Sequence, residues 1–383
     1  MLINADFHIH SPYSGGTSDK INLKRLAEGA KKKGLHLLAT GDCLHDAWMA
    51  EIKKGSMGDG IIKYEGMNFI LTAEIEDVHR VHHLLLFPDY DAVACFKKII
   101  EKKCNDCDNG RPRVAIDGGA VIEAATSCNA LIGPAHAFTP WTSLYAYFDS
   151  ISYYGEKPHF LELGLSADSN YADRIAELND IPFLSNSDSH SATPHRLGRE
   201  FNILEVKEIT WDDISKVIID GRITNVGVPP EKGKYNRTAC TSCYRQYAVE
   251  EAKRMKWRCY CGGIIKKGVR DRVNELATFD KPHHPEWRGK YIYMLPLVEI
   301  ISHALQLPEN SSLVIKRWNE LLSIGNEIDI LLNAELEEIK RVTPPAIYEA
   351  IKAFREGNIK IKAGGGGKYG EIIIGGKDDM RDR

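Results

Sequence analysis

The chain has 383 residues, more than one hydrophobic core usually serves, so we expect two or more domains. Hydrophobic residues make up 43% and charged residues 27%, which excludes a chain that is disordered throughout. No apolar run reaches the roughly 18 residues needed to span a membrane, and the first residues do not resemble a signal peptide. We therefore expect a cytoplasmic protein without a membrane segment.

The first 225 residues alternate short apolar runs with amphipathic stretches such as 23–33 and 171–179. Strands that alternate with helices are typical of parallel β/α units, and their number favours a barrel over a small open sheet. In such barrels the functional side chains lie where the strands end. The predicted strands are 2–9, 35–40, 68–76, 82–87, 130–133, 160–165, 182–185 and 202–206.

Residues 226–230 contain one glycine and two prolines, which break this pattern and predict a linker. We expect an α/β fold in three parts: a barrel over 1–225, a four-cysteine module over 231–275, and a mainly helical region over 276–383. The helical region ends in a Gly-rich tail that begins at Gly364.

Histidines and acidic residues recur near the predicted strand ends. His8 and His10 project from one face of the first strand, because side chains two residues apart point the same way. Asp188 and His190 repeat that spacing at a later strand end. Such repetition is hard to explain by core packing, since buried ionisable groups need partners, and it predicts a metal-dependent hydrolase. The other candidates are Asp42, His45, Glu74, His82, His83 and His136.

These residues carry a resemblance to a known family. His8-Ile9-His10-Ser11, Glu74, His83, His136 and Asp188-Ser189-His190 resemble the PHP (polymerase and histidinol phosphatase) family. Its members are distorted (β/α)7 barrels that bind two or three metals and hydrolyse phosphoesters. The segment 187–201, the cysteine module and the Gly-rich tail extend the resemblance to the archaeal endonuclease Q family over nearly the whole chain.

The resemblance implies a ligand set for two divalent metals, with zinc, manganese and magnesium as the candidates. His8, His10, Glu74 and Asp188 would surround one metal, while Glu74, His83 and His136 would hold the second, with Glu74 as the bridge. His83 is preferred to His82 because it directly precedes an apolar run, as the family's histidine does. Only one of the two can face the metals unless a bulge intervenes, since one step along a strand reverses the face.

A third metal position departs from the family pattern. Many relatives carry a ligand where this chain has Ser14-Gly15-Gly16, and Cys43 stands where they have a histidine. Asp42 and His45 could rebuild this site, so two metals are expected and a third is left open.

Three residues that follow the last ligand pair are candidates for holding a phosphate. Guanidinium groups bind phosphate through paired hydrogen bonds, although surface ion pairing or helix capping would explain the same residues. The three residues are His195, Arg196 and Arg199. Together with Glu74 and Asp188 they form the predicted catalytic group.

Four cysteines in two close pairs predict a structural zinc site: Cys240, Cys243, Cys259 and Cys261. The surrounding segment 231–272 has twelve Lys or Arg against four Asp or Glu, a charge of +8 in a chain whose net charge is −3. A basic patch of this kind favours a polyanion such as nucleic acid, with a solvated charged face as the alternative. The predicted DNA contacts of this segment are Lys256, Arg258, Lys266, Lys267 and Arg270. The Gly-rich tail could be a flexible segment, but the resemblance to endonuclease Q implies further DNA contacts at Gly366, Lys368 and Tyr369.

The resemblance implies a DNA repair endonuclease acting on damaged DNA. It would use a metal-activated water to hydrolyse the phosphodiester 5′ to a deaminated base (uracil, hypoxanthine or xanthine) or an abasic site. A histidinol-phosphatase-like enzyme for small phosphoesters is the alternative, but it leaves the basic module without a role. A DNA-binding scaffold without catalysis is disfavoured by the near-complete ligand set.

Overall fold

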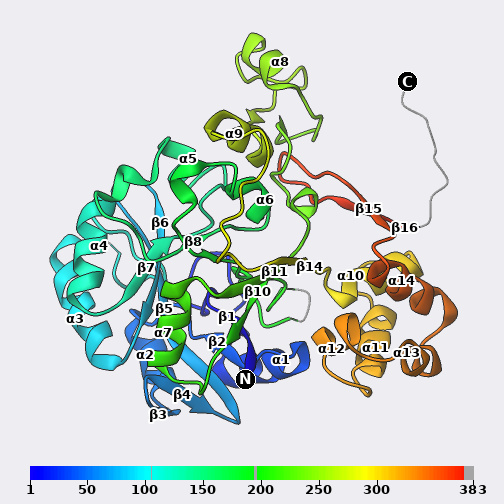
Figure 1. Cartoon of the computed structure of the whole chain (residues 1–383), viewed down its shortest axis with the longest axis horizontal. Helices are drawn as coiled ribbons and strands as arrows, with labels where there is room; N and C mark the ends of the chain where they lie inside the picture. The colour runs from blue at the N-terminus through cyan, green and yellow to red at the C-terminus, as the bar shows by residue number, and fades with distance from the viewer. Residues whose placement is uncertain (105, 194–195, 375–383) are drawn as a thin grey trace.

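The structure is a computed structural model that describes residues 1–104, 106–193 and 196–374 (Figure 1). It contains an α/β body, a four-cysteine module that projects from it, and a group of helices near the C-terminus. In the part of the chain that the structure describes, no helix is long and apolar enough to cross a membrane.

The α/β body is built on a sheet with the order β14-β11-β10-β1-β2-β5-β4-β3, in which β6 also pairs with β5 and β7. Strands β8 and β9 pair with each other, and all eight predicted strands overlap an observed one. The bounds are β1 Leu2–Asp6, β2 Leu37–Ala39, β3 Ser56–Gly58, β4 Ile61–Tyr64, β5 Met67–Glu76, β6 His82–Phe87, β7 Leu131–Pro134, β8 Leu161–Glu162, β9 Phe183–Leu184, β10 Phe201–Glu205, β11 Ile223–Gly227 and β14 Tyr291–Tyr293.

The pairing is mixed rather than wholly parallel. β1, β2 and β5 are parallel, as expected, but β5, β6 and β7 are successively antiparallel. The reason is the short connection between β5 and β6, where the Asp77 carboxylate accepts hydrogen bonds from the N–H groups of His79 (2.8 Å) and Val81 (2.9 Å). A connection this short can only reverse the chain, because a parallel crossover needs a dozen or more residues.

Helices lie between many of the strands along the chain and cover the sheet (Figure 1). The first coincides with the predicted stretch 23–33: the Asn22 side chain accepts a hydrogen bond from the Arg25 N–H at its start, and Gly34 ends it with a φ of 100°. The helices of the body are α1 Leu23–Lys33, α2 Asp46–Ile52, α3 Tyr90–Ile100, α4 Gly118–Ser127, α5 Leu144–Tyr147, α6 Ser169–Ala172 and α7 Trp211–Asp220.

The four-cysteine module has a small core of its own. Strands β12 (Ala239–Cys240) and β13 (Ile265–Lys266) form an antiparallel pair, and the helices are α8 (Val249–Arg254) and α9 (Val269–Leu276). Its buried cluster has five residues: Cys240, Tyr247, Ala252, Cys259 and Ile265. Because two of the five are cysteines, the stability of the module depends on what these cysteines bind.

The region after residue 276 is less uniform than the sequence indicates. Its first part returns to the body as β14, which pairs with β11. A helical domain follows, and a hairpin of β15 (Ile359–Lys362) and β16 (Glu371–Ile374) lies between it and the module (Figure 1). The helices are α10 Leu297–Leu305, α11 Ser312–Leu321, α12 Glu327–Leu332, α13 Leu336–Val342 and α14 Pro345–Arg355.

A buried ion pair connects this helical domain to the body. Lys33, at the end of α1, contacts Glu327 of α12 at 2.6 Å, and both side chains are fully buried. Glu327 also accepts hydrogen bonds from the Leu297 N–H (3.0 Å) and the Trp318 ring (2.7 Å). All polar atoms of this carboxylate therefore have partners, which a buried charge requires.

Candidate metal centre

The predicted ligands gather at one edge of the central strands. β1, β5 and β7 point toward this edge, so the residues at or after their ends meet there. β6 runs the opposite way and contributes its first residue instead. Two groups of three candidate ligands result: His8, His10 and Asp188; and Glu74, His82 and His136.

In the first group, two imidazoles face one carboxylate. Asp188 Oδ1 lies 3.7 Å from His8 Nε2 and 3.2 Å from His10 Nε2. The opposite nitrogens are already bound, His8 Nδ1 to Glu162 (3.0 Å) and His10 Nδ1 to Asp42 (3.0 Å). Such carboxylate partners orient a metal-binding histidine and direct its other nitrogen at the ion.

In the second group, Glu74 lies between two imidazoles. Glu74 Oε1 is 2.8 Å from His82 Nδ1 and 2.9 Å from His136 Nε2. The other oxygen, Oε2, lies 3.4 Å from His10 Nε2 and accepts a hydrogen bond from Arg111 at 3.1 Å. Glu74 thus touches both groups, which is the position a bridging ligand needs.

The structure brings His82, and not the predicted ligand His83, beside Glu74. His82 points toward Glu74, whereas His83 points to the opposite face, where its ring nitrogens contact Tyr154 (2.7 Å) and Asp77 (2.8 Å). Adjacent strand residues face opposite sides, as expected. The apolar run that follows His83 does not indicate which of the two histidines faces the ligands.

Several ligand atoms are buried without a hydrogen-bond partner among the described residues. A buried polar atom without a partner lowers the stability of the fold, unless a bound ion or molecule supplies the partner. The convergence of these ligand atoms at one place fits bound cations, because imidazole and carboxylate are the donors that zinc and manganese accept. They are His8 Nε2, His10 Nε2 and Asp188 Oδ1.

The electrostatics keep both central carboxylates ionised. Burial acts to raise the pKa of Glu74, but the positive charges of His82 and Arg111 hold that pKa well below its ordinary value. Burial likewise opposes ionisation of Asp188, yet His8 and His10 hold the pKa of Asp188 well below normal. An ionised carboxylate is the form that binds a cation.

The backbone at the site is held in an unusual conformation. Asp42, His136 and Asp188 have φ values of 42°, 32° and 45°, in the left-handed region that residues other than glycine rarely adopt. Strain of this kind persists only where the surroundings impose it, and it is concentrated at functional sites.

The residues proposed for a third metal have other roles here. The Asp42 carboxylate contacts His10 and accepts hydrogen bonds from the Ser11 N–H (2.7 Å), the Ser11 hydroxyl (2.6 Å) and the Ser14 hydroxyl (2.9 Å). His45 accepts a hydrogen bond from the Trp48 N–H, and its ring stacks on Tyr13 with centroids 3.9 Å apart. Asp42 therefore supports His10, and neither residue joins a group of three ligands in the described ranges.

His190 lies beside the first group without completing it. Its ring centroid is 4.4 Å from that of His10, and its Nδ1 lies 3.7 Å from Asp188 Oδ1.

Cys43 is buried, which raises the pKa of its thiol well above the ordinary value. Cys43 belongs to no group of candidate ligands among the described residues.

Sequence reasoning missed two residues of the site. Glu162 contacts His8, and its position at the end of β8 was a usable signal, since the other ligands also lie at strand ends. Arg111 donates a hydrogen bond to Glu74 from a loop, where no pattern marks it.

The tail reaches the two predicted phosphate-binding arginines. Tyr369 Oη accepts hydrogen bonds from Arg196 (3.0 Å) and Arg199 (3.3 Å). Burial acts to raise the pKa of Tyr369, but Arg199, Lys234 and Arg196 lower it below its ordinary value. Arg199 also donates a hydrogen bond to the Ser187 carbonyl (3.2 Å), next to Asp188, while the prediction for His195 lies outside the described residues.

A cavity of about 280 Å³ adjoins the ligands. Its walls combine the metal-ligand cluster with cations and aromatic rings from other parts of the chain, so a substrate in it would touch all of them. Among its lining residues are His82, His136, Asp188, Arg111, Arg199, Lys234, Trp141 and Tyr235.

The four cysteines converge as predicted. Their sulfurs lie within 4.8 Å of one another, and the pairs Cys240–Cys261 and Cys243–Cys259 are both separated by 3.5 Å. Tyr247 donates a hydrogen bond to the Cys259 sulfur (2.9 Å), which lowers the pKa of that thiol to about 6. This arrangement fits a tetrahedral structural zinc.

The five predicted DNA contacts of the module differ in their surroundings. Lys256 and Arg258 are exposed and form no ion pair within the described residues. Lys267 pairs with Glu275 (2.6 Å) and Arg270 pairs with Asp271 (2.9 Å), so part of their charge is already used. Lys266 lies over the Trp141 ring, 5.5 Å from its centroid.

The tail residues predicted to contact DNA differ in burial: Gly366 is buried, Tyr369 is partly buried and Lys368 is exposed. A side chain at Gly366 would lie 2.2 Å from the Cys240 carbonyl oxygen, so the glycine is needed for close approach to the module. Lys368 forms an ion pair with Glu371. Gly366 therefore has a packing role in this structure.

Comparisons with known proteins agree with this architecture. Residues 296–358 match the family model described as the MJ0043 C-terminal domain. The uncharacterized protein MJ0043 of Methanocaldococcus jannaschii is 46% identical over 261 residues, which are 66% of this chain and 33% of that protein, so the match spans a third of its length. The uncharacterized protein YqxK of Bacillus subtilis is 29% identical over 97% of this chain and 99% of its own.

Two solved structures match the whole molecule. The lesion-specific endonuclease PfuEndoQ of Pyrococcus furiosus is 45% identical, with a TM-score of 0.91 over 98% of this chain and 96% of that one. An endonuclease Q bound to a 27-mer duplex with an abasic lesion at its active site is also 45% identical, with a TM-score of 0.94 over 98% and 97% of the two chains. Identity at this level over the full length of both chains means that this chain belongs to the endonuclease Q family.

Proposed function

We propose that this protein is a metal-dependent DNA repair endonuclease that hydrolyses a phosphodiester bond beside a damaged nucleotide. The observation that carries the proposal is the position of Glu74 between two groups of ligands, at a cavity that also contains Arg199 and Lys234. A cation cluster beside fixed positive side chains suits a phosphodiester, whose charge is negative throughout hydrolysis. The similarity to an endonuclease Q bound to an abasic duplex supports DNA as the substrate.

The residues of the site would divide the work. His8, His10 and Asp188 would hold one metal, His82 and His136 the other, and Glu74 would bridge them. A metal pair supplies an activated water and neutralises charge on the phosphate oxygens. The guanidinium groups of Arg196 and Arg199 would bind the phosphate by charge-assisted hydrogen bonds, with Tyr369 holding both groups in place.

We infer that the damaged nucleotide is extruded into the cavity beside the ligands, and that the cut lies 5′ to it. The altered edge of a deaminated base is hidden in a duplex, so an enzyme must turn the nucleotide out to read it. Trp141 and Tyr235 line the cavity with their ring centroids 4.3 Å apart, and a base could stack on them. Uracil, hypoxanthine, xanthine and abasic sites are the proposed lesions.

The alternative is a phosphatase for small phosphoesters. The ligand cluster alone would serve that reaction, and a small ester would fit the cavity. The tail and the cysteine module disfavour it, because both contribute to the site from outside the body. Lys234 lines the cavity, and Tyr369 accepts a hydrogen bond from the cavity residue Arg199.

A nicking assay separates the two functions. The protein is incubated with Mn²⁺ and end-labelled duplexes that carry one deoxyuridine, one deoxyinosine or one abasic site, or no lesion. We expect a nick 5′ to each lesion, none in the undamaged duplex, and none with Asp188→Asn. Release of phosphate from small esters without nicking would overturn the proposal in favour of the phosphatase.

A further inference from the structure

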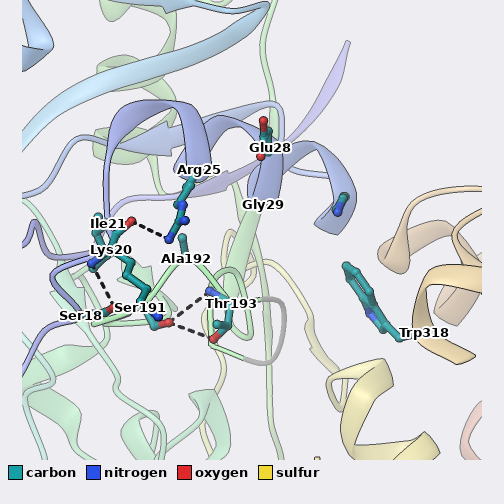
Figure 2. Close-up of a pocket in the computed structure, with 11 residues that line it drawn as sticks. Ser18, Lys20, Ile21, Arg25, Glu28, Gly29, Ser191, Ala192, Thr193 and Trp318 are labelled. Atoms are coloured by element: carbon teal, nitrogen blue, oxygen red, sulfur yellow. Dashed lines mark hydrogen bonds between the residues drawn. The ribbon is translucent and has the colours of Figure 1, made fainter. Parts of the chain in front are cut away.

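A second cavity adjoins the segment that follows the ligand Asp188 (Figure 2). Its volume is about 230 Å³, and it is enclosed by the loop before α1, by α1 itself, by residues 191–193 and by Trp318 of α11. Neither the metal-ligand cluster nor the cysteine module contributes to its walls, so nothing proposed above gives it a role.

The cavity is lined by three cations and one carboxylate. Lys20, Arg25 and Lys32 are exposed and form no ion pair with any described residue, and Glu28 supplies the negative charge. Figure 2 shows Lys20 and Arg25 close to the turn formed by Ser191, Ala192 and Thr193. Arg25 donates a hydrogen bond to the Lys20 carbonyl (3.2 Å), but none of the three cations has an acidic partner in the described ranges, unlike Lys267 and Arg270 of the cysteine module. Long cationic side chains of this kind are available for a phosphate.

Hydroxyl groups and backbone contacts fix the wall that faces these cations. Ser191 Oγ lies 3.0 Å from Thr193 Oγ1 and accepts a hydrogen bond from the Thr193 N–H at 3.2 Å. The Ser18 N–H donates to the His190 carbonyl at 3.2 Å. The cavity is therefore connected directly to the segment that carries Asp188, and its position relative to the metal centre is fixed.

The other walls are also rigid. A side chain at Gly29 would lie 2.9 Å from the Ala192 carbonyl oxygen, so this glycine allows α1 and the turn to approach closely. Trp318 is buried, and Lys32 Nζ lies 5.8 Å from its ring centroid. Trp318 is thus a wall that the helical domain supplies, with no free face on which a base could stack.

We propose that this cavity binds a backbone phosphate of the DNA at a fixed distance from the metal centre. The inference rests on the proposed function and deepens it, because it names a second contact that sets the register of the strand. Three unpaired cations on a surface next to a nuclease centre match the regular charge of a phosphodiester backbone. Contacts of this kind position the duplex without reading its sequence or its lesion.

The test is the salt dependence of DNA binding, measured in an Asp188→Asn background so that the duplex stays intact. Each lost phosphate contact lowers the slope of log affinity against log salt by about one. We expect the double variant Lys20→Gln, Arg25→Gln to lower this slope by about one. The loss of affinity should be equal for duplexes that contain uracil, an abasic site or no lesion. Lys24→Gln, an exposed residue of α1 outside the cavity, is the matched control.

A slope equal to that of the control would overturn the proposal. A second arm shortens the duplex one base pair at a time on either side of the lesion. The difference between the variant and the control should vanish when one side is shortened but not the other, since one phosphate occupies the cavity. If inorganic phosphate competes without any length effect, the cavity binds free phosphate and the DNA assignment is wrong. Binding is measured without cleavage, so absence of nicking by the unmodified protein would refute the proposed function separately.

Discussion

His82 and His83 are adjacent in β6 but have opposite surroundings, which gives a test at the scale of one residue. His82 contacts Glu74 at 2.8 Å, so His82→Gln should remove one ligand and lower both the metal content of the body and the nicking rate, the latter by a hundredfold or more. His83 contacts Tyr154 and Asp77 away from the ligands, so His83→Gln should keep the metals and cost roughly 1–3 kcal/mol of stability. Metal analysis and denaturant unfolding measure these effects, and equal metal loss in both variants would contradict the assignment.

Glu200 gives a second test at the residue scale, through pH. Burial raises its pKa well above the ordinary 4.5, against the opposing charge of Arg199. A raised folded-state pKa means that this group stabilises the fold at pH values below 4.5 and that the contribution is lost as the pH rises toward the folded pKa. Glu200→Gln stays neutral, so its free energy of unfolding should exceed that of the unmodified protein increasingly as the pH rises from 5 to 8. A difference in the free energy of unfolding between the two proteins that stays constant across that pH range would rule this out.

The cysteine module tests the account at the scale of one element. Cys243→Ser removes one of four converging sulfurs, so we expect one zinc fewer per chain, weaker DNA binding and unchanged metal content in the body. Ser242→Ala, a neighbour in the same turn, should keep the zinc. A Cys243→Ser protein with its full zinc content would show that the four sulfurs are not a zinc site.

The elements also show what the sequence could and could not predict. Eight strands and α1 agree with the prediction because hydrophobic periodicity and the Asn22 and Gly34 signals are local. β3, β4, β11 and β14 are not predicted, and the linker predicted over 226–230 overlaps the end of β11. The reversal of β6 does not follow from the alternation of strands and helices, because it depends on the short turn at Asp77, which leaves no room for a helical crossover. The meeting of Tyr369 with Arg196 could not be predicted, since no local pattern links residues 173 positions apart.

At the scale of the whole molecule, the buried pair Lys33–Glu327 connects the helical domain to the body. Removing one partner leaves a buried charge uncompensated, so Lys33→Met should cost about 3–5 kcal/mol of unfolding free energy. Lys24→Met on the exposed face of the same helix should cost little. Lys33→Met combined with Glu327→Gln should cost less than the sum of the two single changes, because the two groups are coupled. Strict additivity in this cycle would contradict a direct coupling.

We propose that a metal pair bridged by Glu74 cuts DNA beside a lesion. The most direct measurement removes the metals of the body with a chelator, confirms the loss by metal analysis, and adds Mn²⁺ back while following the nicking of a duplex with one deoxyuridine. We predict that nicking is absent after removal and returns as two equivalents bind in the body, always 5′ to the lesion, and that Glu74→Gln does not recover it. Lesion-directed nicking by the metal-free protein, or full recovery in Glu74→Gln, would contradict the account.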